Sequence, residues 1–269
     1  MANKTIVITG ASAGIGAGVA RRLAADGHTL VLTARRQSEL ERLADDLNAN
    51  GSRALAVVAD ATSRTDLQTV ATTAIDRFGG FDVWINNAGQ GMTRTVLELS
   101  DIDVDEMMSV NLKSALHGMQ IAAGYFMGNG SDATGHIINV SSFLARVPLA
   151  THRSAYNASK AALNALTANL RMDLRKTHPN IHVTLVMPGM VATEFGKNAV
   201  YSPPETPIYS GPYVQSVEDV ADVFARVIEN PVAEVYTNPR SSEMVRDYFA
   251  DVDAFEARGI GWGSAPAGR

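Results

Sequence analysis

The chain has 269 residues, of which 46% are apolar and 19% charged, a balance typical of a soluble protein with a sizeable core. Its 23 Lys and Arg residues against 28 Asp and Glu residues give a net charge of −5, so no basic surface for nucleic acid is expected. The absence of cysteine excludes disulfides, thiolate catalysis and cysteine-ligated metals. Because no apolar run approaches the ~18 residues of a membrane span, and the first ten residues lack the apolar region of a signal peptide, we expect a cytoplasmic protein with no membrane partner.

Short apolar runs alternate with amphipathic stretches along most of the chain. Candidate strands cover residues 5–9, 29–33, 54–58, 82–86, 136–140, 182–187 and 233–237. Their nearly continuous apolar character is typical of parallel strands buried on both faces. Candidate helices cover 17–26, 38–50, 62–78, 104–127, 156–177 and 217–229, the last with Ser216 as its N-cap. This alternation predicts an α/β fold: a Rossmann-type, doubly wound, seven-stranded parallel sheet with helices on both faces.

The whole chain, residues 1–269, is predicted to form one dinucleotide-binding domain, because no linker is long or polar enough to divide it. Residues 196–214 contain four prolines and no periodicity. A connection of that length in a compact domain is usually functional, so we expect a substrate loop or lid over about 195–216. The C-terminal tail, from about 240 to 269, is expected to be irregular.

A glycine-rich stretch, "TGASAGIG" at residues 9–16, follows the first candidate strand directly and precedes a helix. Such a turn lets the backbone approach a pyrophosphate, whose charge the helix amides favour. The glycines, Gly10, Gly14 and Gly16, are not spaced as G-x-G-x-x-G, and a tight turn that simply needs glycine is the alternative. The position favours a cofactor site, because ligands bind at the carboxyl ends of parallel strands.

The end of the second candidate strand indicates which nicotinamide cofactor is bound. An acidic residue there would accept a hydrogen bond from the ribose 2′-hydroxyl, whereas arginine accommodates a 2′-phosphate. The sequence "LVLTARRQ" has no acid and places Arg35 and Arg36 together. Two cations at a helix N-terminus oppose the helix dipole, so we prefer an anion between them to two solvated arginines. The prediction is NADP, with Ser12 and Thr33 as further donors.

Taken together, the motifs resemble those of the short-chain dehydrogenase/reductase family. The matches, in the family's order over residues 5–195, are "TGASAGIG", "AD" at 59–60, "NNAG" at 86–89, "VNL" with Asn111, "IINVSS" ending at Ser142, "YNASK" at 156–160 and "PGMVAT" at 188–193. The resemblance implies an NADP(H)-dependent oxidoreductase that transfers a hydride between nicotinamide and a carbonyl or secondary alcohol. It also implies a homodimer or homotetramer.

The resemblance assigns catalysis to Asn111, Ser142, Tyr156 and Lys160. Hydride transfer to a carbonyl needs an acid at the developing alkoxide. A free Tyr has a pKa of about 10, and we expect the ammonium of Lys160, one turn away, to lower that of Tyr156. By resemblance, Lys160 also bonds the nicotinamide ribose, and Asn111 holds a water that connects Lys160 to solvent. Ser142 would bond the substrate oxygen and stabilise its charge.

Two departures from the family pattern affect these assignments. The segment from Ser142 to Tyr156 is one residue longer than usual, which leaves Ser141 as an alternative to Ser142. Adjacent strand residues face opposite sides, and this alternation favours Ser142. Many NADP-dependent members carry a basic residue where this chain has Ala13, so the 2′-phosphate would rest on the arginine pair alone.

The remaining site residues are placed by position along the motifs. Cofactor contacts are assigned to Gly10, Ser12, Ala13, Gly14, Ile15, Gly16, Arg35, Arg36, Asp60, Ala61, Asn87, Ala88, Gly89, Tyr156, Lys160, Pro188, Gly189, Val191 and Thr193. The substrate cavity would be bordered by Met92, Leu144, Val147, Met190 and Phe195, although core packing explains each equally well. Trp84 is expected in the core. No His–carboxylate cluster has ligand spacing, so no metal is expected.

Three basic residues near the motifs have open roles. His152 and Arg153 could touch substrate, but a surface turn is the preferred interpretation. Arg94 would meet either an acidic substrate or solvent.

Two rival functions remain. A non-catalytic NADP-binding regulatory protein could use the same fold, although such proteins usually lack one of Tyr156 and Lys160. A 3-ketoacyl-carrier-protein reductase would need a basic face for its acidic carrier, which the net charge of −5 disfavours. The preferred partner is therefore a small-molecule ketone or alcohol.

Overall fold

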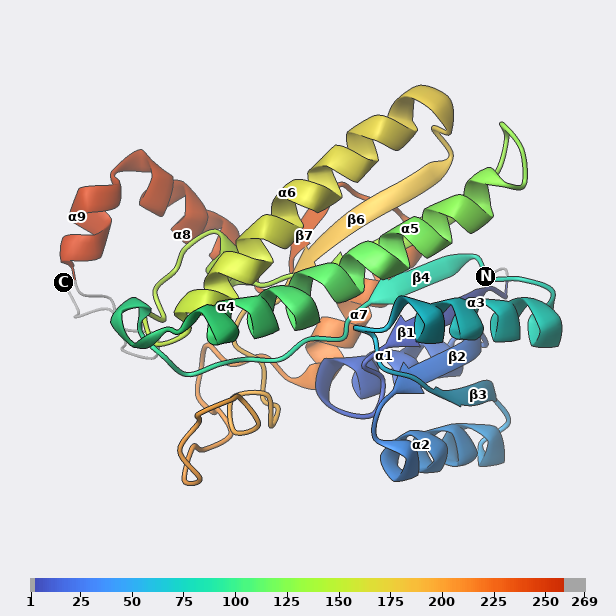
Figure 1. Ribbon diagram of the computed structural model, residues 1–269, viewed down its shortest axis with the longest axis horizontal. Coiled ribbons are helices and arrows are strands. Elements are labelled where there is room, and N and C mark those ends of the chain that lie inside the picture. The colour runs from blue at the N-terminus through green and yellow to red at the C-terminus, as the bar shows by residue number, and fades with distance from the viewer. Residues whose placement is uncertain (1–2, 259–269) are drawn as a thin grey trace.

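Seven parallel strands lie at the centre of the structure, a computed structural model that describes residues 3–258 (Figure 1). Their spatial order is β3-β2-β1-β4-β5-β6-β7, with the reversal of a doubly wound fold between β1 and β4. Each end of every predicted strand is confirmed to within one residue. The strands are β1 (Thr5–Thr9), β2 (Thr29–Ala34), β3 (Arg53–Val58), β4 (Val83–Asn86), β5 (Gly135–Val140), β6 (Ile181–Met187) and β7 (Glu234–Tyr236).

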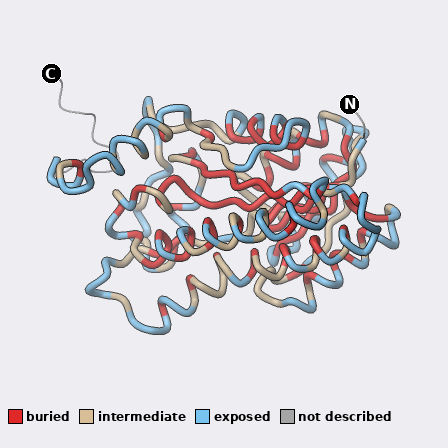
Figure 2. Tube along the Cα trace, turned by 90° about the horizontal axis from the view of Figure 1, so that it is seen from above, coloured by how far each residue is buried: buried red, intermediate tan, exposed pale blue. Residues whose placement is uncertain are grey.

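Helices cover both faces of this sheet and enclose two separate cores. The main helices are α1 (Gly14–Ala25), α2 (Gln37–Ala49), α3 (Arg64–Phe78), α4 (Asp101–Met108), α5 (Ser114–Met127), α6 (Ser154–Thr177) and α7 (Val217–Glu229). One core joins α1, α2 and α7 to one face, and the other joins α3, α5 and α6 to the opposite face. Successive strand residues alternate between them: Ile6 and Ile8 face α1, while Val7 faces the other side. The trace through the middle of Figure 2 is accordingly buried.

The two edge strands, β3 and β7, are not fully buried, although the sequence predicts strands that are buried on both faces. The side chains of β3 are mostly half-buried, and Arg53 and Val58 at its ends are exposed. All three residues of β7 are half-buried. Each of these strands has a neighbour on only one side, so fewer side chains cover it.

The long helix predicted over 104–127 is interrupted. It begins at Asp101, because Ser100 and Asp103 form a capping box. A π-helical turn over Ser109–Lys113 then separates α4 from α5 and carries Asn111 on its inner side. The Asn111 side chain is hydrogen-bonded to the backbone of Gln90, and π turns of this kind occur frequently at functional sites.

The connection between β6 and α7, residues 188–216, contains no helix or strand within the described chain, which agrees with the loop expected there. One isolated bridge, between Val200 and Met92, ties it to the rest of the molecule, and another, between Val191 and Gln215, joins its two ends. It ends where the Ser216 hydroxyl accepts from Asp219 N at 3.0 Å, which confirms the predicted N-cap of α7. Its role as a lid stays a prediction.

The C-terminal tail is helical where irregular structure was expected. Helices α8 (Pro239–Ala250) and α9 (Val252–Ala257) project at one end of the molecule (Figure 1). Two polar caps that the sequence analysis overlooked explain this, because Asn238 caps α8, with Pro239 in its first turn, and Asp251 caps α9. Residues 259–269 of the expected tail lie outside the described part. Over residues 3–258, no helix has the length and apolar character needed to cross a membrane.

Candidate active site

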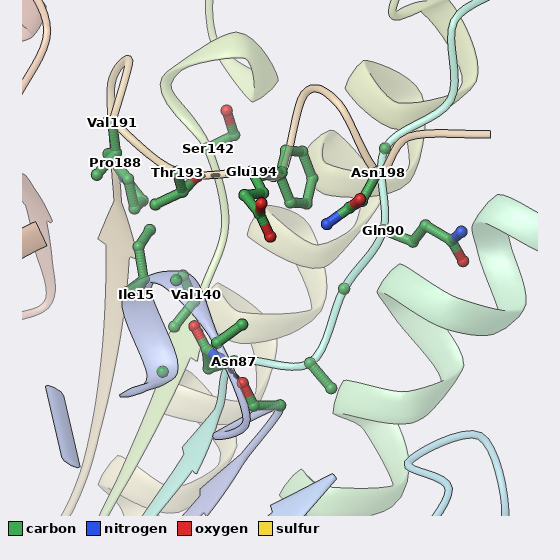
Figure 3. Close-up of a pocket in the computed structure, with 18 of the residues that line it drawn as sticks. Ile15, Asn87, Gln90, Val140, Ser142, Pro188, Val191, Thr193, Glu194 and Asn198 are labelled. Carbon is green, nitrogen blue, oxygen red and sulfur yellow. Dashed lines mark hydrogen bonds between the residues drawn. The ribbon is translucent and has the colours of Figure 1, made fainter. Parts of the chain in front are cut away.

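A cavity of about 870 Å³ opens at the carboxyl ends of the strands. Every predicted cofactor contact contributes to its wall, as do Ser142 and residues of the loop after β6. Figure 3 shows Asn87 and Ile15 beside the glycine-rich turn, with Ser142 across the cavity from them. Thr193, Glu194 and Asn198 extend from the loop after β6 (Figure 3). The topology therefore brings residues from distant parts of the sequence to one edge of the sheet.

The glycine-rich turn requires glycine for its conformation and for close approach. Gly10 and Gly14 have φ values of +65° and +52°, in the left-handed region that favours glycine. A Cβ on Gly16 would lie 2.4 Å from the carbonyl oxygen of Gly10. Ala13, the N-cap of α1, supplies no side-chain cap, so the first amides of this helix could hold an anionic group.

The segment after β4 supports this turn through hydrogen bonds. The Asn87 side-chain amide donates to the carbonyl oxygens of Thr9, at 2.9 Å, and Gly10, at 3.1 Å. The Thr9 hydroxyl accepts from the backbone amides of Asn87 and Ala88, both at 3.0 Å. These bonds fix the glycine-rich turn against the strand beside it.

Cationic and unpaired polar groups lie at the end of β2. Arg35 and Arg36 are exposed in the cavity wall, and Arg36 donates from Nε and Nη2 to the Ser12 hydroxyl at 3.3 and 3.1 Å. The Thr33 hydroxyl is buried without a hydrogen-bond partner. In the next loop, Asp60 Oδ1 accepts from the amide and hydroxyl of Thr62, at 2.9 and 2.8 Å. An unpartnered hydroxyl beside two cations fits an adenosine ribose with a negatively charged group.

Tyr156 and Lys160 lie one turn apart on the buried side of α6, with 8% and 4% of their surfaces exposed. The Lys160 ammonium donates to the carbonyl oxygen of Val140 at 2.9 Å and lies 6.0 Å from the centre of the Tyr156 ring. An ammonium has three donors. One is used at the end of β5, and the others could serve groups bound in the cavity.

The two serines after β5 have different environments. The Ser141 hydroxyl is bonded to Asn164 Oδ1, at 2.5 Å, and to the carbonyl oxygen of Lys160, at 3.2 Å. The Ser142 hydroxyl accepts from the Leu144 amide at 3.1 Å, and it acts on the Tyr156 hydroxyl to lower the pKa of that phenol. Strand alternation thus places Ser142 beside Tyr156, as predicted. The 3-10 turn η3 (Phe143–Ala145) follows at once and lies in the segment that is one residue longer than usual.

Asn111 is fully buried behind the cavity wall. Its side-chain amide pairs with the backbone of Gln90, accepting at 2.9 Å and donating at 3.0 Å, and also donates to the Ser159 hydroxyl at 3.2 Å. A Cβ on Gly89 would lie 2.9 Å from Asn111 Oδ1 and 3.3 Å from Lys160 Nζ. Asn111 therefore supports the segment that separates it from the cavity. Its predicted contact with a water stays a prediction.

Burial is the main influence on the protonation of Tyr156 and Lys160. Burial raises the pKa of Tyr156, and its hydrogen bond with Ser142 and the positive charge of Arg153 oppose that rise. Burial lowers the pKa of Lys160 to about 8. The expectation that Lys160 lowers the pKa of Tyr156 is therefore wrong, because loss of hydration dominates and Arg153 supplies the opposing charge.

Three of the five predicted substrate contacts lie in the cavity wall: Leu144, Met190 and Phe195. The prediction is wrong for Met92 and Val147, which belong to hydrophobic clusters and are 1% and 0% exposed. Sequence position alone could not distinguish a side chain that faces the cavity from one that faces the core. Trp84 is fully buried, as expected.

Arg153 is a cavity residue that the sequence analysis placed on a surface turn. It is 6% exposed and lines the cavity, whereas His152 beside it is exposed at the wall. Positions 153, 156 and 160 follow the i, i+3, i+7 pattern of one helix face. That spacing was the available signal, and it was overlooked because arginine is usually exposed.

Arg94 does not line the cavity, and its side chain, 31% exposed, is partly in contact with solvent. Its guanidinium forms an ion pair with the buried Asp103 at 2.9 Å and stacks over the ring of Tyr201 at 3.8 Å. The residue therefore joins α4 to the loop after β6. Among residues 3–258, no cluster of His, Asp and Glu is arranged to hold a metal ion.

Comparison with known proteins gives a consistent result. Residues 4–202 match the model of a family described as short chain dehydrogenase. An uncharacterized oxidoreductase of Bacillus subtilis, YxnA, is 32% identical over 234 residues, which are 87% of this chain and 65% of that protein. The chain thus spans slightly less than two thirds of this relative.

Two solved structures have the same architecture. A short-chain dehydrogenase/reductase from Burkholderia phymatum in complex with NAD is 26% identical and superposes with a TM-score of 0.85, covering 99% of this chain and 98% of that one. An alcohol dehydrogenase from Thermococcus sibiricus complexed with 5-hydroxy-NADP is 27% identical, with a TM-score of 0.74, and covers 87% of this chain and 96% of that one. These two similar proteins hold different forms of the nicotinamide cofactor.

The lowered pKa of Lys160 predicts a specific dependence of stability on pH. Between the folded pKa of about 8 and the ordinary lysine pKa of 10.5, the unfolded chain binds more protons than the folded one, so stability rises with pH in this window. We expect the free energy of unfolding of the wild type, relative to Lys160→Met, to increase by about 2 kcal/mol between about pH 7.5 and 9.5.

Denaturant unfolding at the two pH values measures this difference. Lys176→Met is the matched control, because Lys176 is an exposed lysine on the same helix, and the relative stability of this variant should stay constant. An equal response from both variants would show that Lys160 titrates like a solvated lysine.

Proposed function

The chain belongs to the short-chain dehydrogenase family, and we propose that it is an NADP(H)-dependent oxidoreductase that interconverts a carbonyl group and a secondary alcohol. The observation that carries this proposal is the meeting of Ser142, Tyr156 and Lys160 at one cavity. All three side chains line the same cavity, and Lys160 lies one turn beyond Tyr156 on the same helix. Family members share the fold with many activities, so the function is argued from these side chains.

In the direction of reduction, Tyr156 donates the proton. Its raised pKa keeps the phenol protonated at neutral pH, as a proton donor requires. A bound reduced nicotinamide supplies the hydride to the carbonyl carbon. The Tyr156 proton moves to the carbonyl oxygen as negative charge develops there, and the product is a secondary alcohol. In oxidation the phenolate accepts the same proton.

Ser142 and Lys160 assist this proton transfer. The Ser142 hydroxyl, in the same cavity wall as Tyr156, would donate to the substrate oxygen and stabilise its developing charge. The ammonium of Lys160, fixed at Val140, has donors free for the nicotinamide ribose. Asn111 is a positioning residue in this mechanism, since it holds the Gly89–Gln90 backbone that lies between it and the cavity.

The arginine pair supports NADP over NAD. Arg35 and Arg36 lie in the cavity wall after β2, where the ribose 2′ position is read. Both are exposed, and the hydrogen bond of Arg36 to Ser12 aligns that guanidinium with the glycine-rich turn. A 2′-phosphate would supply the anion that this cationic pair lacks.

Replacing Tyr156 tests the catalytic assignment. Tyr156→Phe removes only the hydroxyl, and we expect kcat for NADPH-dependent ketone reduction to fall at least about 100-fold while NADPH binding persists. Tyr125→Phe serves as the control, because Tyr125 stacks on Phe81 in the core that lies away from the cavity. Unchanged turnover in the Tyr156 variant would exclude this residue as the proton donor. Cofactor binding without turnover by the wild type, across a broad carbonyl panel, would favour a non-catalytic NADP-binding protein.

Replacing Arg35 tests the cofactor assignment by binding alone. In Arg35→Asp a carboxylate would repel the 2′-phosphate and attract a 2′-hydroxyl, so the ratio of the NADP+ and NAD+ dissociation constants should shift at least about 10-fold towards NAD+. Calorimetric titration of both cofactors measures the ratio. The control Arg42→Asp makes the same charge change at an exposed position of α2 outside the cavity wall. If both variants shifted the ratio equally, net charge would explain the preference, and no 2′-phosphate site would be needed.

A further inference from the structure

The cavity wall contains a buried guanidinium with incomplete hydrogen bonding. Arg153 is 6% exposed; its Nη1 has no hydrogen-bond partner, and its Nη2 makes one long bond, 3.4 Å, to the carbonyl oxygen of Gly196. Over residues 3–258 it forms no ion pair. Burying a charge without a partner is strongly unfavourable, so this arrangement requires a reason.

The position of this guanidinium is closely defined by its surroundings. A Cβ on Gly91 would lie 3.0 Å from Nη1, and one on Gly196 would lie 3.5 Å from Nη2, so the group occupies space left by two glycines. The backbone at Arg153 is held as well. Arg94 pairs with Arg153 in an isolated bridge, and the Arg94 amide donates to the carbonyl oxygen of His152 at 2.8 Å. Arg153 is therefore held in place before any ligand binds.

Arg153 also lies beside the proposed proton donor. It precedes Tyr156 by three residues at the start of α6, and such residues are neighbours on a helix surface. Its charge acts on the Tyr156 hydroxyl, and both side chains line the same cavity. Glu194 contributes a carboxylate to that wall, but it is exposed and unpaired with Arg153.

We propose that Arg153 binds a carboxylate of the substrate, so that the carbonyl compounds reduced here are short oxo acids and the alcohols oxidised are the corresponding hydroxy acids. This inference rests on the proposed function and names its substrate class. A guanidinium matches the planar geometry of a carboxylate and can bind it through two parallel hydrogen bonds. The proximity of Arg153 to Tyr156 requires that only a few bonds separate the carboxylate from the reacting carbonyl.

The reaction balances with this substrate. The hydride adds to the carbonyl carbon, the Tyr156 proton goes to the carbonyl oxygen, and the carboxylate stays ionised on Arg153 throughout. The products are a hydroxy acid and the oxidised cofactor. Leu144, Met190 and Phe195 give the same cavity an apolar surface for a short aliphatic remainder.

A structural role for Arg153 is the competing explanation, because its bond to Gly196 could simply hold the loop after β6. The experiment therefore compares each short oxo acid with its methyl ester in the wild type, Arg153→Met and Arg153→Lys, using NADPH oxidation. We expect the wild type to prefer the acid. In Arg153→Met the KM for the acid should rise about 10- to 100-fold more than the KM for the ester, since any effect of the lost charge on Tyr156 is common to both substrates. Arg153→Lys should keep part of the preference.

Two kinetic results would overturn the proposal: a wild type that uses ester and acid equally, or an Arg153→Met variant that loses both activities to the same extent.

Binding provides a readout that does not depend on turnover. Calorimetric titration of the NADP+ complex with oxamate, an unreactive analogue of an oxo acid, should give binding in the wild type and at least about 10-fold weaker binding in Arg153→Met. If the wild type reduces no carbonyl compound, the proposed function fails. In that case oxamate binding still tests, separately, whether Arg153 binds a carboxylate. Absent or unchanged binding would refute the carboxylate site.

Discussion

The junction between the end of β5 and helix α6 is the constraint on which the site depends. The Lys160 ammonium donates to the Val140 carbonyl oxygen, and the Ser141 hydroxyl is bonded to Asn164 and to the backbone of Lys160. These contacts fix the rotation of α6 about its axis. Tyr156 consequently faces the cavity beside the last residues of β5, and the same rotation orients the start of the helix. A different rotation of α6 would turn Tyr156, the proposed proton donor, away from the cavity.

The polar groups of the site are buried, so the rest of the fold must offset the free energy that their burial costs. Tyr156, Lys160 and Arg153 are all buried, and burial opposes the charged forms of Tyr156 and Lys160. The apolar cores on the two faces of the sheet provide the opposing stability. A fully buried polar network adds to it, because Asn139 joins Asn86 of β4 to Thr167 of α6 through hydrogen bonds. Proteins usually accept a loss of stability at a functional site and compensate for it in other parts of the fold.

The sequence was most informative where the fold repeats a simple physical rule. Strands buried on both faces must be continuously apolar, so the five inner strands were recognisable, and the edge strands β3 and β7 were recognisable from their short apolar runs. The order of the motifs placed Tyr156 and Ser142 at the same cavity. Features that depend on tertiary contacts were missed: the π turn at Asn111 depends on pairing with Gln90, and the burial of Arg153 depends on distant glycines. Met92 was misplaced because cavity and core positions share the same apolar character. The helices after Asn238 were signalled by local caps, but their weak apolar pattern concealed them.

A crystal structure of the protein with NADP+ bound would test most directly whether the β5–α6 junction sets the active site. We predict that the reactive carbon of the nicotinamide faces the Tyr156 hydroxyl, that Lys160 bonds the adjoining ribose while keeping its bond to Val140, and that the 2′-phosphate lies at Arg35 and Arg36. A nicotinamide directed away from Tyr156, or a rotation of α6 that breaks the contact between Lys160 and Val140, would contradict the proposed organisation of the site.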